Sequence, residues 1–443
     1  MAEARQITQP DTIGGMLYTP EMLELQGEIH HRLLQETDFA TLEGMTDGQL
    51  MDHIRDFALE VLGEHERTLP GRTLEQLIEC VLYEVTGLGP LEILLDDNSI
   101  TEIMVNGPDQ VMIERDGHLS QVAVRFADED HILRIVEKII APLGRRLDEA
   151  VPMVDARLAD GSRLNAIITP LAVKGPYVTI RKFAAIPLTD EDLVRFGTLD
   201  PQMRDFLRCC IEGKLNIMVS GGTGSGKTTT LNVLTSFIPH GERVVTIEDA
   251  AELQLQQDHV LTLESRPPNL EGTGEITIRD LVRNALRMRP DRIIVGEVRG
   301  GEALDMLQAM NTGHEGSLST AHTNGPRDCL ARLETMVLMA GTELPSHAIR
   351  QQISSAVDLI VHQDRLRDGS RKITYITEVQ RMESEEIVTQ DLFHLTYHGI
   401  DQDSKLIVEH QPTGLQPLFV DKLAAYGVEL PENIFMPQES VVA

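Results

Sequence analysis

Paired cysteines and long apolar runs are both missing from this chain. The four cysteines, Cys80, Cys209, Cys210 and Cys329, show no C-x-x-C spacing, so the sequence indicates neither zinc nor a disulfide framework. No apolar run approaches the roughly 18 residues that a membrane-spanning helix needs, and residues 1–20 are too polar for a signal peptide. We therefore expect reduced thiols in a soluble, intracellular protein.

Basic residues are also scarce. The chain has 39 Lys and Arg against 70 Asp and Glu, a formal net charge of −31. Nucleic acid and anionic lipid both require a large cationic face. The composition therefore argues against free binding to either, although a local basic patch stays possible. With 443 residues, 41% of them hydrophobic, the chain can hold two or three domains with real cores.

What the chain does contain is a glycine-rich loop with the sequence Gly221-Gly222-Thr223-Gly224-Ser225-Gly226-Lys227-Thr228. It fits the phosphate-binding pattern G-x-x-x-x-G-K-[ST] and lies between an expected buried strand at 215–219 and an expected helix at 229–238. Glycine conformations let backbone N–H groups point at phosphate oxygens, and a helix N-terminus adds partial positive charge. Lys227 would neutralise the β/γ phosphates, and the Thr228 hydroxyl would bind Mg²⁺. We predict a nucleotide site here that also includes Thr229.

The first half of the chain divides into segments that differ in their hydrophobic periodicity. Residues 1–19 lack periodicity and are expected to form a disordered arm. Helical spacing at 21–35, 47–62 and 73–85 predicts a helical bundle over residues 20–87, whose role stays open. Short alternating segments and one helix (130–142) predict an α+β domain over 88–183. The expected strands are 100–106, 110–114, 119–125, 153–158, 163–168 and 177–183.

The second half alternates strands with helices. Residues 184–189 contain Pro187 and are expected to form a hinge-like linker. The alternation over 190–398 predicts a mostly parallel sheet with crossover connections and, from residue 358, an antiparallel extension. Residues 399–443 are polar and mixed, and we interpret them as an appendage of uncertain order.

Acidic residues follow two apolar strands of this half. Strand 292–295 is followed by Gly296 and Glu297, as in a Walker B element that brings a carboxylate to Mg²⁺ and the attacking water. Glu248 and Asp249 end strand 243–247. They are candidates for the same cavity, with a solvated strand end as the equal alternative.

Histidines and arginines add further candidates. His314 and His322 bracket an expected strand, and we favour only His322, which stands at its carboxyl end and could sense a γ-phosphate. Among the arginines of the α+β domain, Arg157 and Arg163 flank the Asp160-Gly161 turn and Arg181 follows on a later strand. Each can be a surface charge or a phosphate contact. Three more arginines near the Walker B strand can reach a neighbouring subunit or form surface ion pairs: Arg287, Arg289 and Arg299.

Taken together, these segments resemble the secretion ATPase superfamily, most closely the CpaF/TadA-type motors of Tad (Flp) pilus assembly. The resemblance covers roughly residues 85–435. Besides the Walker A loop, it is carried by Gly87–Glu92, Ile103–Gly107, Thr246–Leu253, Leu286–Arg299 and Thr312–Thr323. The paired C-x-x-C motifs of many type II secretion and pilus-extension ATPases are missing, which is consistent with the Tad branch.

The resemblance implies a cytoplasmic homo-hexamer whose N-terminal and RecA-like domains close on ATP at subunit boundaries. It also implies peripheral association with the inner membrane through pilus platform proteins, with no direct nucleic acid and no zinc. By the same resemblance, Lys227 and Thr228 bind phosphates and Mg²⁺, Glu248 and Glu297 surround Mg²⁺ and water, and His322 lies near the γ-phosphate. Arg157, Arg163 and Arg181 would face the nucleotide.

Three other functions are considered. One is a nucleotide-binding scaffold or sensor without turnover, which Glu248 and Glu297 in hydrolytic positions disfavour. A type IV secretion or conjugation traffic ATPase is the alternative within the superfamily, and a RecA-like nucleic-acid motor is the alternative outside it. The first reading is a hexameric ATP-hydrolysing motor for pilus assembly, with retraction left open.

Overall fold

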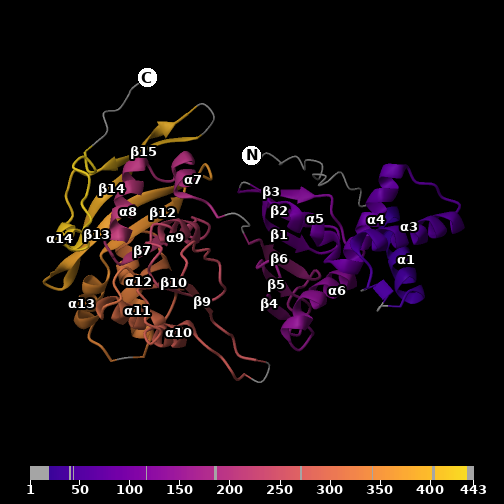
Figure 1. Ribbon diagram of the computed structural model, residues 1–443, viewed down its shortest axis with the longest axis horizontal. Coiled ribbons are helices and arrows are strands. Elements are labelled where there is room, and N and C mark those ends of the chain that lie inside the picture. The colour runs from indigo at the N-terminus through magenta and orange to yellow at the C-terminus, as the bar shows by residue number, and fades with distance from the viewer. Residues whose placement is uncertain are drawn as a thin grey trace. The chain divides into compact units, whose positions relative to one another are not determined.

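The computed structural model describes residues 19–38, 41–42, 44–115, 117–183, 187–269, 272–341, 343–401 and 405–436. The chain divides into two compact units, Met1–Ala185 and Ile186–Ala443, whose elements are labelled in Figure 1. Apart from Thr19, the arm expected at 1–19 lies outside the described residues, as does half of the linker expected at 184–189. None of the described helices is long and apolar enough to cross a membrane.

Three amphipathic helices open the first unit (indigo in Figure 1). They are α1 (Pro20–Glu36), α3 (Asp47–Glu64) and α4 (Gly71–Thr86). The Thr19 and Thr46 side chains accept hydrogen bonds from the first turns of α1 and α3, which supplies partners for N–H groups that a helix start leaves free. Apolar residues such as Ile29, Ile54 and Val81 are fully buried in a shared core. The three predicted helices are confirmed.

A six-stranded antiparallel sheet completes the first unit. Its strands are β1 (Ile100–Asn106), β2 (Val111–Arg115), β3 (His118–Val122), β4 (Met153–Arg157), β5 (Arg163–Ile167) and β6 (Tyr177–Arg181), in the order β3-β2-β1-β6-β5-β4. Helix α6 (Glu129–Ile140) buries its apolar face in the core that the sheet's inward side chains form. The short elements η1 (Gly89–Leu91), α5 (Glu92–Asp96) and η2 (Ala141–Leu143) connect these parts. The opposite face of the same strands is more exposed and mixes polar residues with apolar ones such as Leu119 and Met153, which are 63% and 60% exposed.

A buried carboxylate joins the bundle to the sheet domain. Glu84 on α4 is only 6% exposed. It accepts a hydrogen bond from Gln26 Nε2 on α1 at 2.8 Å and pairs with His131 Nε2 on α6 at 3.0 Å, while Lys138 Nζ donates to the Glu84 carbonyl at 2.6 Å. A Cβ added to Gly89 would lie 2.7 Å from a Glu84 oxygen, so glycine is required there. Part of the Gly87–Glu92 motif is therefore a structural joint.

The second unit is built on a nine-stranded mixed sheet. Its order is β15-β14-β13-β12-β7-β11-β10-β8-β9. The strands are β7 (Ile217–Gly221), β8 (Val244–Glu248), β9 (Val260–Glu264), β10 (Arg292–Val298), β11 (Leu318–His322), β12 (Leu359–Arg365), β13 (Arg371–Glu383), β14 (Glu386–Ile400) and β15 (Leu406–Pro412). The six strands from β12 to β9 are parallel and the other three antiparallel. The predicted RecA-like P-loop domain, preceded by a smaller α+β domain and a helical bundle, is confirmed as the fold class.

Helices cover both faces of the parallel strands. They are α7 (Asp190–Arg195), α8 (Pro201–Glu212), α9 (Lys227–Thr235), α10 (Ile278–Ala285), α11 (Glu302–Asn311), α12 (Pro326–Met339), α13 (Ser346–Ala356) and α14 (Val420–Ala425). Ile217 and Val219 of β7 belong to the core that α8 and α9 share, whereas Met218 belongs to the core on the α10–α13 side. Continuous burial of β7 follows from this two-sided cover.

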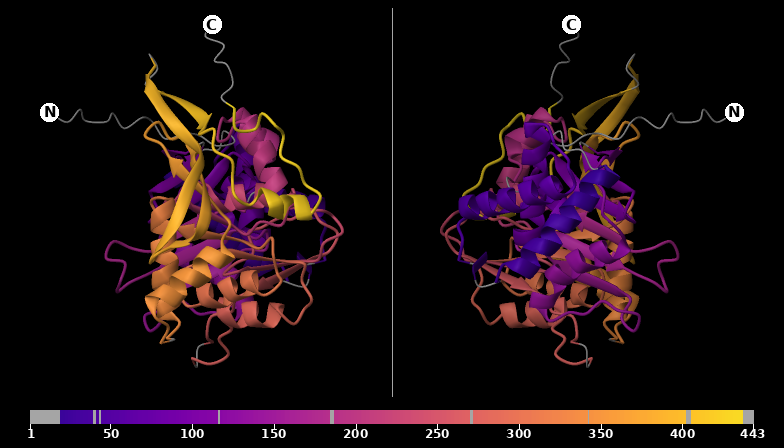
Figure 2. Two further views of the ribbon diagram at one scale, coloured as in Figure 1. Left: turned by 90° about the vertical axis from the view of Figure 1, so that its left-hand side faces the viewer. Right: turned by 90° about the vertical axis from the view of Figure 1, so that its right-hand side faces the viewer.

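The C-terminal residues correct one prediction. The appendage expected at 399–443 is, over the part that the structure describes, integral to the second unit: β15 pairs with β14, and Phe419, Leu423 and Phe435 are buried in the main core. Figure 2 lets the reader follow the long orange and yellow strands and the yellow segment that carries α14. The burial of these residues depends on packing against Phe206 of α8 and Phe393 of β14, which local spacing does not record.

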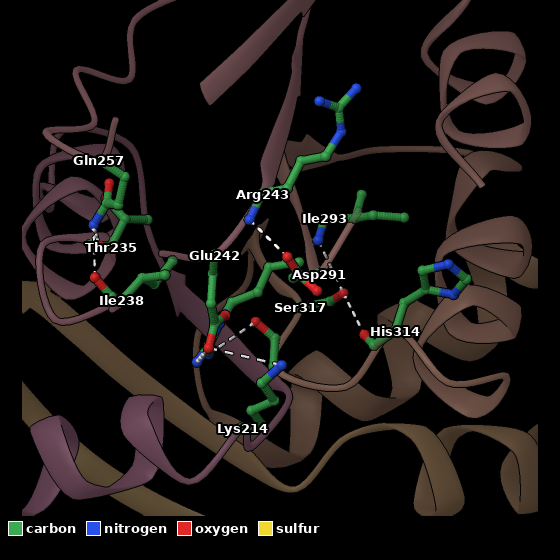
Figure 3. A network of polar contacts seen from close by, with 12 residues as sticks. Lys214, Thr235, Ile238, Glu242, Arg243, Gln257, Asp291, Ile293, His314 and Ser317 are labelled. Carbon is green, nitrogen blue, oxygen red and sulfur yellow. Dashed lines mark hydrogen bonds and ion pairs between the residues drawn. The ribbon is translucent and has the colours of Figure 1, made fainter. Parts of the chain in front are cut away.

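Polar side chains organise the amino ends of the parallel strands (Figure 3). Asp291 accepts a hydrogen bond from the Arg243 N–H at 2.8 Å, and the Ser317 hydroxyl donates to the His314 carbonyl at 2.7 Å. Arg292, fully buried, pairs with Glu242 at 2.5 Å. These contacts tie together the loops that enter β8, β10 and β11. The polar side chains named at this edge of the sheet form hydrogen bonds and ion pairs that stabilise the fold.

Candidate functional site

The glycine-rich loop joins two central elements of the second unit. β7 is buried throughout and lies between β11 and β12. Helix α9 begins at Lys227, two residues earlier than predicted, so its first N–H groups border the loop. Gly224 and Gly226 adopt positive φ angles of 70° and 97°, a conformation that favours glycine. The loop therefore ends on a helix N-terminus, where backbone N–H groups and the helix dipole favour an anion.

Lys227 brings a cation to the loop. Its ammonium donates to the Gly222 carbonyl at 2.9 Å. Burial lowers the pKa of Lys227, while the nearby Glu297 carboxylate opposes that shift. Thr228 and Thr229 follow in the first turn of α9 and are half-buried. Ser225 is buried and its hydroxyl donates to Gly222 O at 3.0 Å, whereas Thr223 at the tip is exposed.

Glu248 ends β8 as predicted and is 4% exposed. Its carboxylate accepts hydrogen bonds from the N–H groups of Glu252 and Leu253 at 3.0 and 3.2 Å. A Cβ added to Gly296 on the neighbouring β10 would lie 2.8 Å from Glu248 Cγ, so Glu248 lies against that glycine. Glu248 is therefore a buried carboxylate that caps backbone N–H groups after its strand: of the alternative, a solvated strand end with capping carboxylates, the capping is observed and the solvent exposure is not.

Glu297 lies within a strand instead of after one. β10 was predicted to end at Val295 but extends to Val298, and its pairing with β11 shifts register between Val295 and Val298. Such an irregularity re-aims side chains at the edge of a sheet. The Glu297 carboxylate accepts two hydrogen bonds from the Arg299 guanidinium, at 2.6 and 2.9 Å.

Arg299 links two of the candidate carboxylates. Besides Glu297 it contacts Asp249, with NH1 3.4 Å from Oδ2. These ion pairs raise the pKa of Arg299, the hydrogen bond to Glu297 contributing most. Of the two roles considered for this arginine, the structure supports an ion pair within its own chain.

His322 is the last residue of β11, and the two candidate histidines stand at opposite ends of this strand. It lies opposite Gly221 in the parallel register, and the following Thr323 donates its N–H to Gly221 O at 3.3 Å. His314 precedes the strand, at the polar amino edge drawn in Figure 3. Since β11 lies between β7 and β10, the carboxyl edge of three adjacent strands carries the phosphate loop, His322 and Glu297.

The three N-terminal arginines form one row in the first unit. Arg157 faces Arg163 across β4 and β5, Arg163 faces Arg181 across β5 and β6, and Arg181 faces Glu102 on β1. Directly opposed residues project from the same face of a sheet. Arg181 also pairs with Glu102 at 2.7 Å, and Arg157 Nε donates to Gly161 O at 3.2 Å. The row brings together three arginines that are scattered along the sequence.

The residues at the loop fit a nucleotide with Mg²⁺. Among the described residues, no group of three His, Cys, Asp or Glu side chains forms a metal site. Mg²⁺ bound to nucleotides takes most of its ligands from phosphates and water, so one or two protein oxygens suffice. The Thr228 hydroxyl and the Glu297 and Glu248 carboxylates are hard donors of that kind. The half-buried Lys227 supplies the countercharge that phosphates need.

Two contacts to the loop, and a third that supports one of them, were missed from the sequence. Gln363 of β12 and Arg371 of β13 donate to carbonyl groups of the loop, and Thr230 of α9 contacts Gln363. No spacing pattern signals these residues, because the contacts depend on β12 lying beside β7.

The fold and the loop together define a P-loop protein with a RecA-like domain. More narrowly, the chain belongs to the family described as type II/IV secretion system protein, whose model matches residues 84–401. Membership implies nucleotide binding.

Several relatives are similar over most of their length. A putative conjugal transfer protein of Mycobacterium tuberculosis is 39% identical over 306 residues, which is 68% of this chain and 86% of that protein. The type IV secretion system protein VirB11 of Brucella suis is 32% identical over 320 residues, 66% of this chain and 88% of that protein. The crystal structure of the VirB11 ATPase from Brucella suis in complex with sulphate is 31% identical, covers 65% of this chain and 95% of that one, and has a TM-score of 0.36.

Proposed function

We propose that this protein hydrolyses ATP with Mg²⁺ in its second unit. The observation that carries the proposal is the arrangement at one sheet edge, where a glycine-rich loop with Lys227 adjoins Glu297. Family membership supports the same reading. A scaffold that binds nucleotide without turnover would not require carboxylates at this edge.

The side chains divide the work by their surroundings. Lys227 neutralises the phosphates, and bound Mg²⁺ would withdraw charge from them with Thr228 among its ligands. The Glu297 side chain is 25% exposed and that of its partner Arg299 is 63% exposed, so water can reach Glu297, which would orient or deprotonate the attacking water. Glu248 holds its loop in place and would add negative charge to a Mg²⁺ site. His322 contacts the γ-phosphate.

We further propose that the chain acts as a homo-hexamer. The row Arg157, Arg163 and Arg181 would contact nucleotide phosphates in that hexamer, because guanidinium groups bind phosphate with two parallel hydrogen bonds. If neighbouring subunits of the oligomer share each nucleotide site, turnover should depend on protein concentration.

The proposed cellular role is a motor for Tad-type pilus assembly. The chain would work in the cytoplasm, held at the inner membrane by pilus platform proteins, and the motifs quoted above support this assignment. The names of the relatives favour a second candidate, a traffic ATPase of type IV secretion or conjugation. A RecA-like nucleic-acid motor has less support because the net charge is −31.

Two experiments test the oligomeric ATPase activity and the cellular role separately. The full-length protein is assayed for ATP hydrolysis with Mg²⁺ over a range of concentrations, with native mass measured in parallel. Turnover that rises with the hexamer fraction supports the motor, and full activity of a monomer refutes it. In the host, deletion of the gene should remove surface pili. Intact pili together with lost DNA transfer would favour the conjugation ATPase.

A further inference from the structure

The carbonyl groups of the phosphate loop have partners on a neighbouring hairpin. A loop that points its N–H groups at an anion must turn its carbonyl groups outward, and buried carbonyls need donors. Ser225 O accepts a hydrogen bond from Gln363 Nε2 at 2.7 Å, and Gly224 O accepts one from Arg371 Nε at 3.0 Å. The donors come from β12 and β13, more than 130 residues further along the chain.

Gln363 is held so that it can only donate to the loop. It is 2% exposed, and on β12 it lies opposite Gly221 in the parallel register. Its Oε1 accepts the hydroxyl of Thr230, a residue of α9. Because Ser225 O can only accept, the amide nitrogen must face the loop, and the Thr230 hydroxyl keeps the amide in that orientation.

The close approach of β12 also explains two of the loop glycines. A Cβ on Gly221 would lie 2.2 Å from the Gln363 carbonyl oxygen, and a Cβ on Gly226 would lie 3.0 Å from Gln363 Nε2. Any side chain at Gly221 would therefore push the loop away from β12. Gln363 therefore packs closely against the loop at Gly221 and Gly226.

Arg371 makes the second contact from the surface. It is the first residue of β13 and is exposed, yet its Nε–H is directed at the Gly224 carbonyl, in the exposed part of the loop. A charged donor forms a stronger hydrogen bond with a carbonyl than a neutral one does. Gln363 and Arg371 thus hold two successive peptide units of the loop from outside.

We propose that Gln363 and Arg371 are positioning residues for nucleotide binding. They fix the outward carbonyls of Ser225 and Gly224, so that the N–H groups of the loop are oriented for phosphate before the nucleotide arrives. The inference rests on the proposed function, since it assumes that the loop binds nucleotide. Without these donors the loop must be ordered at the cost of binding free energy.

The test uses the full-length protein, with ADP binding measured by calorimetry and ATP turnover measured under steady state. Gln363→Met removes both amide contacts at similar size and should weaken ADP binding about tenfold, equal to about 1.4 kcal/mol. Arg371→Met should weaken it by roughly three- to tenfold. In both variants KM should rise more than kcat falls, because a loop held less firmly binds ground state and transition state equally badly.

Conservative and remote substitutions separate positioning from general damage. Thr230→Val frees the amide of Gln363 and should weaken ADP binding, whereas Thr230→Ser keeps the hydroxyl and should restore it. Arg381→Met changes an exposed arginine on the same strand as Arg371 and should leave binding unchanged. This Ser/Val contrast does not depend on the fold surviving Gln363→Met.

The outcomes distinguish this inference from the function on which it rests. Wild-type binding that Lys227→Ala abolishes, but that Gln363→Met and Arg371→Met leave intact, would overturn the positioning role alone. Equal loss in Thr230→Ser and Thr230→Val would overturn it as well. Failure of the wild type to bind ADP would overturn the proposed function itself.

Discussion

The ion pair at the start of the Walker B strand makes a quantitative prediction. Arg292, the first residue of β10, has a side chain that is 0% exposed, and its Nε lies 2.5 Å from Glu242 Oε2. A second contact joins NH2 to Oε1 at 3.3 Å, and NH1 donates to Gly316 O at 3.4 Å. Glu242 is also 3.7 Å from Lys214 (Figure 3). The perturbation is Glu242→Gln, which removes the charge and keeps the shape.

The expected cost follows from the burial of the guanidinium. Breaking a buried pair by neutralising one partner typically costs about 3–5 kcal/mol, because the other charge is left uncompensated. Here Lys214 would remain as a second cation near Arg292, which adds to the cost. The oxygen of the new glutamine can still accept one hydrogen bond, which reduces the loss of stability. We expect about 3 kcal/mol, a large share of the ~5–15 kcal/mol that stabilises a typical domain.

A double-mutant cycle tests the reasoning. Arg292→Met combined with Glu242→Gln removes both charges and should cost less than Glu242→Gln alone. Hydrogen exchange read by mass spectrometry reports the opening free energy of β8 and β10 separately from the first unit. Glu75→Gln, which breaks an exposed pair with Arg55, is the matched control and should change nothing in β10. A cost under about 1 kcal/mol for Glu242→Gln, or a double variant worse than the sum of its parts, would refute the argument.

Three further predictions follow from single side chains. Lys227→Ala should weaken ADP binding at least about 100-fold by calorimetry, because the cation at the phosphates is lost; binding within a few-fold of wild type would contradict the role of the loop. Glu297→Gln should keep ADP binding while turnover falls roughly 10²- to 10⁴-fold in a steady-state assay, and normal turnover would remove Glu297 from the mechanism. Burial lowers the pKa of His410, which contacts Ile373 O at 3.0 Å, to about 4. The unfolded chain, with a pKa near 6.5, then binds more protons, so stability should fall by up to roughly 3 kcal/mol as pH drops from about 6.5 to about 4. Urea midpoints across this range should be flatter in His410→Gln, and an unchanged slope would contradict the assignment.

Local sequence patterns predicted much of the fold. Helical spacing predicted α1, α3 and α4 to within two residues at each end, because an amphipathic helix records its buried face every three or four positions. The phosphate loop was equally visible, since its glycines, Lys227 and Thr228 are contiguous. Alternation of strands and helices predicted the parallel sheet and its antiparallel extension.

Features that depend on contacts between residues far apart in the sequence could not be predicted. β10 extends through Glu297 with a register shift against β11, and no pattern in β10 alone contains that pairing. The burial of Phe419 and Phe435 depends on packing against Phe206 and Phe393. Gln363 contacts the loop only because β12, over 130 residues away, is the neighbour of β7. Propensity and spacing record neither neighbours nor register.

The two edges of the parallel sheet explain why one end of β11 is a functional candidate and the other is not. At the amino edge, Asp291, Arg292 and Ser317 are occupied by bonds that tie loops to strands, and His314 belongs to this edge. At the carboxyl edge the loop carbonyls are held from outside, which leaves the N–H groups and Lys227 directed inward. Parallel strands bring all their carboxyl ends to one side. The candidate residues Lys227, Glu297 and His322 therefore lie at the carboxyl edge, where Glu248 also anchors the chain after its strand.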